Sequence, residues 1–225
     1  YAFETTTGPA KGVFRLLPDE NDDGKLRAWT VLTALMSIDA HEETVGTARP
    51  TGEVYSREFA GPNWQDRRDL AVAYEDRDPE VLVVGGGQAG VSTAARLTQL
   101  GVDTLIVDTH RRVGDNWRKR YHALVLHNQV HVNHFPYFPF PPNWPTYIPK
   151  DKLAGWFEAY VELMELNYWT GTTFGGGAYD EKDGCWTVEL TGEDGTIGQL
   201  RPKHIVMAAS VSGIPNLPTI PTLER

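Results

Sequence analysis

The chain has 225 residues, 40% of them hydrophobic and 23% charged, which is typical of a globular protein. Its net charge of −9 argues against nucleic acid as the main partner. No apolar run approaches the length of a membrane span, and Cys185 is the only cysteine, so no disulfide can form within the chain and we expect a cytoplasmic protein without a membrane span.

Residues 1–38 are predicted to form the end of a β-rich domain. Strands are expected at residues 12–17 and 25–35, because the Asp-Gly turn within residues 21–24 favours a hairpin between them. Both faces of the second strand are largely apolar, which suggests a larger sheet, since an isolated hairpin is marginal in water. The chain begins without a methionine inside this β segment, so we expect it to be part of a longer protein.

Residues 39–78 differ in composition from what precedes them. They are rich in Glu, Arg, Thr, Pro and Gly and contain scattered aromatic residues. We interpret this segment as a linker that docks on the next domain through its aromatic side chains, with a short helix at residues 64–74.

Residues 80–108 form the centre of the chain, with the sequence EVLVVGGGQAGVSTAARLTQLGVDTLIVD. Residues 81–84 and 104–107 are unbroken apolar runs, as in strands that are buried on both faces. A glycine turn and a helical pattern beginning near Gln88 lie between them. Strand, turn, helix and strand in this order predict the opening βαβ unit of a dinucleotide-binding fold.

The glycine spacing in this unit predicts a site for a pyrophosphate. Gly85, Gly87 and Gly90 form G-x-G-x-x-G, in which the first glycine allows the turn, the second admits the pyrophosphate and the third lets the helix pack closely. The helix points its free N–H groups toward the phosphates. Asp108 ends the second strand, where an acid binds ribose hydroxyls and repels a 2′-phosphate, so FAD or NAD is favoured over NADP. The alternative is a glycine turn kept for packing.

A basic stretch follows, at residues 110–120. Gly114, Trp117 and Arg118 are expected near the nucleotide, and Arg118 is a candidate phosphate ligand because a guanidinium matches phosphate geometry. The alternative is a solvated basic face made of Arg111, Arg112, Arg118, Lys119 and Arg120.

The rest of the chain is predicted to complete an α/β domain. We expect a short strand and loop at residues 121–129, an ordered proline-rich loop at 135–149, an amphipathic helix at 151–167, a β-meander at 168–179, 185–190 and 196–200, and a buried strand at 204–209. His127, His131 and His134 have a spacing that metal ligands use, but no cysteine or clear carboxylate is nearby, so we predict no metal site. The absence of C-x-x-C disfavours a disulfide reductase.

Several motifs together resemble the flavin-containing monooxygenases, and the plant indole-3-pyruvate monooxygenases in particular. They are the glycine fingerprint, Asp108, GDNWR at 114–118, LHN at 126–128, FPYFPFPPNWPTY at 135–147 and IVMAAS at 205–210. The resemblance implies that residues 79–225 are a Rossmann-like FAD-binding domain of the three-layer ββα type with an inserted β-meander. The preceding hairpin resembles the last strands of an NTF2-like domain.

The resemblance also implies the chemistry and the residues that carry it. Family members use NADPH to reduce FAD and transfer oxygen from a flavin C4a-hydroperoxide to nitrogen, sulfur or a carbonyl of a small-molecule substrate, with O₂ as co-substrate. The residues expected to bind FAD are Gly85, Gly87, Gln88, Ala89, Gly90, Asp108, Thr109, Gly114, Asn116, Trp117, Arg118, Phe174, Ala208, Ala209 and Ser210. His127 and Asn128 are expected beside the reactive flavin position, where many relatives have Thr-Asn. Asp115 replaces the usual second glycine of Gly-Gly-x-Trp.

The second glycine fingerprint of the family, which binds NADPH, is expected after Arg225, so the isolated chain is expected to be inactive. Two other functions are kept as alternatives: a nucleotide-binding fragment without turnover, and an NAD-dependent oxidoreductase with a single Rossmann unit. The sequence does not identify the substrate or the oligomeric state.

Overall fold

The computed structural model describes residues 1–19, 21, 24–50, 60–210, 213 and 220. The chain divides into two compact units, Tyr1–Arg49 and Pro50–Arg225. None of the helices in the described part of the chain has the length and apolar character that crossing a membrane requires.

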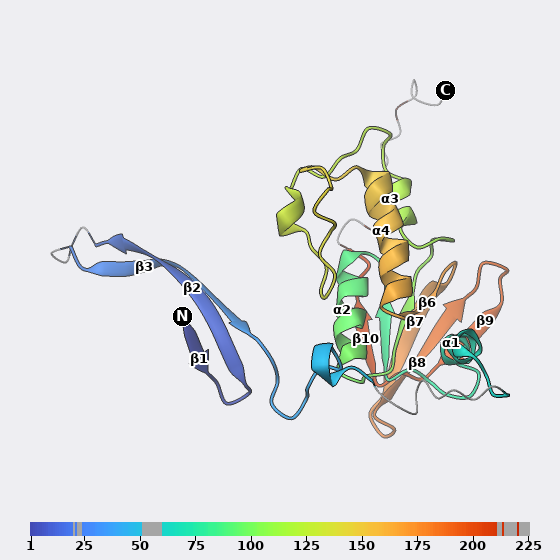
Figure 1. Ribbon diagram of the computed structural model, residues 1–225. Helices are drawn as coiled ribbons and strands as arrows, with labels where there is room; N and C mark the ends of the chain where they lie inside the picture. Colours follow the sequence, from blue (N-terminus) through green and yellow to red (C-terminus); the bar gives the residue numbers. More distant parts are fainter. Residues whose placement is uncertain (20, 22–23, 51–59, 211–212, 214–219, 221–225) are drawn as a thin grey trace. The chain divides into compact units, whose positions relative to one another are not determined.

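The first unit is a three-stranded antiparallel sheet in the order β1-β2-β3, followed by a short 3-10 helix (Figure 1). Its elements are β1 (Ala2–Glu4), β2 (Pro9–Pro18), β3 (Leu26–Leu35) and η1 (Gly46–Ala48). β2 and β3 pair from Ala10 opposite Leu35 to Pro18 opposite Leu26, which is the predicted hairpin with a longer first strand. Every residue of β3 is exposed.

The second unit is built on a parallel sheet in the order β10-β4-β5-β6. The strands are β4 (Val81–Val84), β5 (Thr104–Val107), β6 (Asn167–Trp169) and β10 (His204–Met207). All residues of β4 and β5 are buried, which explains why neither strand alternates between apolar and polar residues. The βαβ unit therefore forms as the sequence predicts.

Two layers cover the faces of this sheet. The helices α2 (Gln88–Gln99) and α4 (Lys150–Leu163) lie on one face, where Val83 and Ile106 pack with Val91, Leu153 and Phe157 (Figure 1). A meander of β7 (Thr173–Asp180), β8 (Cys185–Thr191) and β9 (Ile197–Leu200) covers the other face, where Leu82, Leu105, Val188 and Leu190 share a second core. The predicted three-layer ββα architecture with an inserted meander is confirmed.

Three predicted elements differ in the structure. The segment expected to open the meander at residue 168 divides, since β6 joins the parallel sheet and the chain turns at Gly171, with φ +59°, before β7 begins. The predicted strand near residues 121–129 is only an isolated bridge between Val125 and Pro149. The predicted helix 151–167 begins at Lys150 and ends at Leu163, because residues 167–169 are needed in β6.

The segment before the glycine motif packs on the sheet edge through a helix, α1 (Trp64–Ala73), in the region where the sequence predicts one. Asn63 and Asp66 form a capping box at its start. The Trp169 indole donates a hydrogen bond to the carbonyl of Val72 at 2.7 Å, and the Tyr74 hydroxyl donates one to Asp103 at 2.6 Å. These contacts attach α1 to β6 and to the turn that precedes β5.

Candidate dinucleotide site

A cavity of about 540 Å³ opens at the carboxyl ends of β4, β5 and β10. Parallel strands end at the same edge of a sheet, so the segments after these strands meet there. Gly85 follows β4 and donates to the carbonyl of Val107 at 2.8 Å, and Ala208 follows β10 and donates to the carbonyl of Val84 at 2.8 Å. The predicted site residues that line the cavity are Gly85, Gly87, Asp108, Thr109, Asn116, Ala208, Ala209 and Ser210.

Gly85, Gly86 and Gly87 of the turn and Gly90 of α2 have different surroundings. Gly85 has φ +106°, and a Cβ there would lie 2.7 Å from the carbonyl oxygen of Ala208. A Cβ on Gly90 would lie 1.9 Å from the carbonyl oxygen of Gly85, so the helix packs on the turn itself. A Cβ on Gly86 would lie 1.7 Å from the hydroxyl oxygen of Tyr168. Protein packing therefore requires a glycine at each of these three positions.

Gly87 is the exception. A Cβ at this position would meet only the Asn116 side-chain nitrogen, at 3.5 Å, which is ordinary van der Waals distance. Its φ of −78° and ψ of −171° are open to any residue. Since neither packing nor backbone conformation requires a glycine here, the free space over Gly87 belongs to the cavity at the N-terminus of α2.

Asp108 is held rigidly at the cavity by backbone N–H groups. One carboxylate oxygen accepts from Gly86 at 2.6 Å, and the other accepts from His110 at 2.8 Å. An ionised carboxylate has about four acceptor positions. Asp108 therefore fixes the glycine turn and keeps acceptor capacity for hydroxyl groups in the cavity.

Tyr168 packs against the glycine turn at Gly86. It lies in β6 opposite Ile106, and burial raises the pKa of its hydroxyl, with the negative charges of Asp108 and Asp115 adding to the effect. The hydroxyl is therefore neutral at physiological pH and adds no further negative charge beside Asp108. The sequence analysis did not identify this contact, although three consecutive glycines hint at a close approach by another segment.

The predicted turn residues around α3 (Asp115–Arg118) have mainly structural surroundings. Gly114 has φ +85°, and a Cβ there would lie 2.5 Å from the carbonyl oxygen of Ala154 in α4. Trp117 packs against the helix-layer core, and its indole N–H finds no acceptor among the residues that the structure describes. Asn116 alone of the predicted turn residues lines the cavity.

Arg118 cross-links α3 to α4 and does not line the cavity. Its guanidinium pairs with Asp115 at 3.1 Å and with Glu158 at 2.7 Å, and it donates to the carbonyl of Val113 at 2.6 Å. The buried ammonium of Lys150 holds the same turn by donating to the carbonyl of Arg118 at 2.9 Å.

The ion pairs of Asp115 with Arg118 and Lys119 make the stability of the α3 turn depend on pH. Partial burial opposes ionisation, but hydrogen bonds from Arg118 and Lys119 and their positive charges outweigh it, so the pKa of Asp115 lies below its usual value. A lowered carboxyl pKa gives stability that is present above the unfolded-state pKa and is lost as the pH falls through the folded-state pKa. In urea unfolding, we expect the difference in midpoint between the unsubstituted chain and Asp115→Asn to shrink below about pH 4. A difference that stays constant from pH 7 to acid would contradict this.

The remaining predicted residues lie outside the cavity. Phe174 is in β7, packed in the core between sheet and meander. Gln88, Ala89 and Gly90 lie in the first turn of α2, behind Gly87. His127 and Asn128 are exposed on the loop after Leu126. His134 accepts a hydrogen bond from the Phe140 N–H at 2.9 Å, and the described residues include no group of three His, Cys, Asp or Glu side chains that could hold a metal.

The sequence analysis did not assign several residues that line the cavity: Val107, His110, Lys119, Arg120, Thr172 and Gly213. Thr172 reaches it because its N–H donates to the carbonyl of Asp108 at 2.9 Å. This contact joins segments that are far apart in the sequence, so no local pattern indicates it. Lys119 and Arg120 were part of the basic stretch that we interpreted as a possible solvated face.

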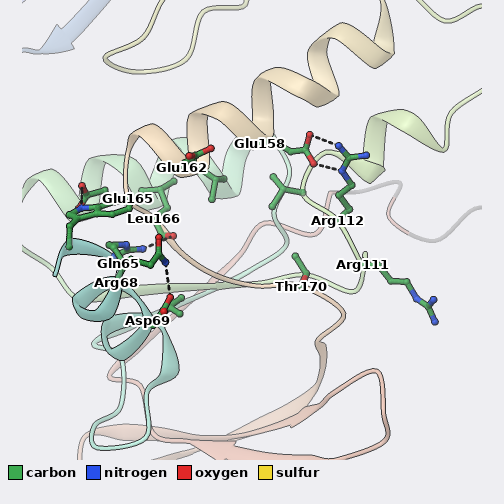
Figure 2. Close-up of a pocket in the computed structure, with 14 residues that line it drawn as sticks. Gln65, Arg68, Asp69, Arg111, Arg112, Glu158, Glu162, Glu165, Leu166 and Thr170 are labelled. Carbon is green, nitrogen blue, oxygen red and sulfur yellow. Dashed lines mark hydrogen bonds and ion pairs between the residues drawn. The ribbon is translucent and has the colours of Figure 1, made fainter. Parts of the chain in front are cut away.

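A second cavity, of about 550 Å³, lies between α1, α4 and the segment after β5 (Figure 2). Most of its polar groups already have partners within the protein. Gln65 donates to Asp69 at 2.8 Å, and Arg68 donates to Asn167 at 3.0 Å. Arg112 forms an ion pair with Glu158. A ligand would have to compete with these contacts, so the cavity at the glycine turn is the better candidate site.

Comparisons with known proteins agree with this fold. A family model described as an NAD(P)-binding Rossmann-like domain matches residues 83–144. The chain is 30% identical over 162 residues to the indole-3-pyruvate monooxygenase YUCCA1 of Oryza sativa subsp. japonica, an alignment that covers 72% of this chain and 37% of that protein. The chain spans 34–37% of the length of the first three curated relatives that it matches.

The chain is also similar in fold to solved structures, among them the following two. A bacillithiol disulfide reductase from Bacillus cereus has a TM-score of 0.58 at 18% identity, covering 65% of this chain and 44% of that chain. A cyclohexanone monooxygenase from Rhodococcus sp. Phi1, solved with bound NADP⁺, has a TM-score of 0.56 at 22% identity, covering 65% of this chain and 28% of that chain. Because a reductase and a monooxygenase match equally well, the fold does not choose between their reactions.

Proposed function

Since the chain is a relative of the flavin-containing monooxygenases, we propose that its second unit binds FAD in the cavity at the glycine turn. The observation that carries the proposal is the open space over Gly87, which the protein itself does not need. The pyrophosphate would lie there, at the N-terminus of α2, where the backbone N–H groups of the first turn, including Gln88 and Ala89, face it.

The adenosine end would lie against the segment after β5. Asp108 would accept hydrogen bonds from the ribose hydroxyls with the acceptor positions that Gly86 and His110 leave open. Thr109 lines the cavity beside it. Ala208, Ala209 and Ser210 would let the cofactor approach the end of β10, because their side chains are small. The backbone of Phe174 remains our prediction for a contact with the adenine.

The flavin end would lie toward α3, where Asn116 lines the cavity. Gly114, Trp117 and Arg118 would act there by fixing the turn against α4, which the ion pairs of Arg118 support. We retain His127 and Asn128 as candidate catalytic residues beside the flavin. Both are exposed, which leaves them accessible to a cofactor or substrate that covers this loop.

For the whole protein we propose an NADPH-dependent monooxygenase that acts on a small-molecule substrate with O₂. Bound FAD would supply the redox chemistry, while the residues of this chain bind it, orient it and shield it from water. Nitrogen, sulfur or a carbonyl is the proposed acceptor of oxygen, and NADPH would bind outside this chain. A cytoplasmic location remains our prediction, supported by the presence of a single cysteine.

The visible absorption spectrum of the purified chain tests the FAD site. After incubation with FAD and removal of excess ligand, we expect the two absorption bands of a bound flavin, and we expect heat to release FAD in a 1:1 ratio to protein. A folded chain of verified mass that stays colourless under these conditions would contradict the proposal. NADPH oxidation with oxygen incorporation into a product, measured on the full-length parent, separately tests the monooxygenase activity.

A further inference from the structure

The basic stretch at residues 111–120 contains five cations, of which only two lie at the cavity of the glycine turn. Arg111 pairs with Glu193, Arg112 with Glu158, and Arg118 with Asp115 and Glu158. Arg111 and Arg112 line the second cavity, between α1 and α4, and not the cavity at the glycine turn (Figure 2). Only Lys119 and Arg120, among these five, line the cavity at the glycine turn.

Arg120 is held at this cavity by α3. Its Nε donates to the carbonyl of Asn116 at 3.1 Å, and its guanidinium carbon lies 5.9 Å from the centroid of the Trp117 ring. These contacts use one of its five N–H donors and one face of its plane. Among the described residues no carboxylate pairs with Arg120, whereas Lys119 pairs with Asp115 at 3.3 Å. Arg120 therefore brings to the cavity a positive charge that no carboxylate of the described residues pairs with.

A dinucleotide needs such a charge at this place. Its pyrophosphate carries two negative charges, and the N-terminus of α2 offers only about half a positive charge. Asp108 adds a further negative charge to the cavity, and the chain has a net charge of −9. The terminal nitrogens of a guanidinium match two phosphate oxygens, so one arginine could balance much of the excess.

We propose that Arg120, and not Arg118, is the cation that binds the pyrophosphate of the dinucleotide. The assignment rests on the proposed FAD site and adds to it a residue outside the glycine motif. Arg118 acts at a distance, by fixing the α3 turn from which Arg120 extends.

Titrations with ADP, adenosine and FAD test the proposal, because ADP carries the pyrophosphate and adenosine does not. For Arg120→Gln in the 225-residue chain we expect about tenfold weaker binding of ADP and FAD, with adenosine affinity unchanged within about twofold. Arg120→Lys should recover part of the loss, since it keeps the charge without the planar fork. Added salt should weaken ADP binding more in the unsubstituted chain than in Arg120→Gln.

Arg111→Gln is the matched control. It removes the same charge nine residues away, from a side chain that is 76% exposed and lines the other cavity, so its effect on ADP should be below about twofold. Equal ADP affinity in Arg120→Gln and the unsubstituted chain would overturn the assignment, and so would an equal loss for adenosine or a loss for FAD alone. Failure of the unsubstituted chain to bind either ADP or FAD would instead remove the FAD site itself, and this inference with it.

Discussion

Gly87→Ala is expected to weaken FAD binding by at least about a hundredfold without unfolding the protein. The added methyl group would occupy the space over the turn where the pyrophosphate must approach the backbone. The protein tolerates it, since the nearest atom is 3.5 Å away on a side chain and the backbone angles suit alanine. Alanine is a poorer N-cap than glycine, so we expect a loss of unfolding free energy of at most about 1 kcal/mol.

Flavin fluorescence titration and urea unfolding, carried out on the same preparation, measure the two effects. The informative result is their separation: a large loss of affinity with a nearly unchanged midpoint. If Gly87→Ala bound FAD as tightly as the unsubstituted chain, the pyrophosphate could not lie over Gly87. The proposed position of the cofactor would then be wrong, even if FAD bound elsewhere.

Gly90→Ala is expected to have the opposite profile, with a large loss of stability. Alanine usually favours a helix over glycine by about 1 kcal/mol. At this position its Cβ would lie 1.9 Å from the carbonyl oxygen of Gly85 and 3.1 Å from its carbonyl carbon, both backbone atoms of the turn. Helix α2 would have to move away from the turn, at a net cost of about 3 kcal/mol of unfolding free energy.

Gly155→Ala provides the control for this variant. Gly155 lies inside α4, and a Cβ there would meet no atom within 4 Å. Helix propensity then acts alone, so the substitution should stabilise the protein by about 1 kcal/mol. Urea unfolding followed by far-UV circular dichroism compares the two. A Gly90→Ala protein as stable as Gly155→Ala would show that the close packing of helix on turn is not a source of stability.

The βαβ unit was predictable because its signals are local. The bounds predicted for β4 and β5 match the structure residue for residue, since strands buried on both faces appear as unbroken apolar runs. The glycine spacing likewise predicts a turn, and Gly85 adopts φ +106° there. The pairing of β2 with β3 was likewise expected from the Asp-Gly pair in the sequence between them.

The place of β6 in the parallel sheet could not be predicted from local sequence, which indicated a strand of the meander there. Its residues, Asn167–Trp169, carry no apolar run. They form a strand because Tyr168 packs beneath the glycine turn and because Trp169 and Asn167 hydrogen-bond to Val72 and Tyr74. Gly86 lies more than 80 residues before Tyr168 in the sequence, and Val72 and Tyr74 lie more than 90 residues before their partners in β6. No local sequence pattern can therefore indicate these contacts.

In the candidate site, too, some residues were predictable from local sequence and others were not. Residues placed by the ends of the strands, such as Gly85, Asp108 and Ala208, line the cavity as expected of the predicted fold. From the basic stretch the sequence analysis selected Arg118, which does not line the cavity. The side chains that face the cavity could not be read from the sequence, since α3 has only four residues and its orientation depends on the contact between Gly114 and Ala154. The sequence therefore predicted the glycine turn, but not which cations of the basic stretch line the cavity beside it.

A crystal structure of the chain with FAD bound tests the central claim most directly. We predict that the pyrophosphate lies over Gly87 at the N-terminus of α2, with the ribose hydroxyls within hydrogen-bonding distance of Asp108. Electron density for the adenosine diphosphate part in the cavity between α1 and α4, or at the glycine turn with Asp108 making no contact to the ribose, would contradict the account.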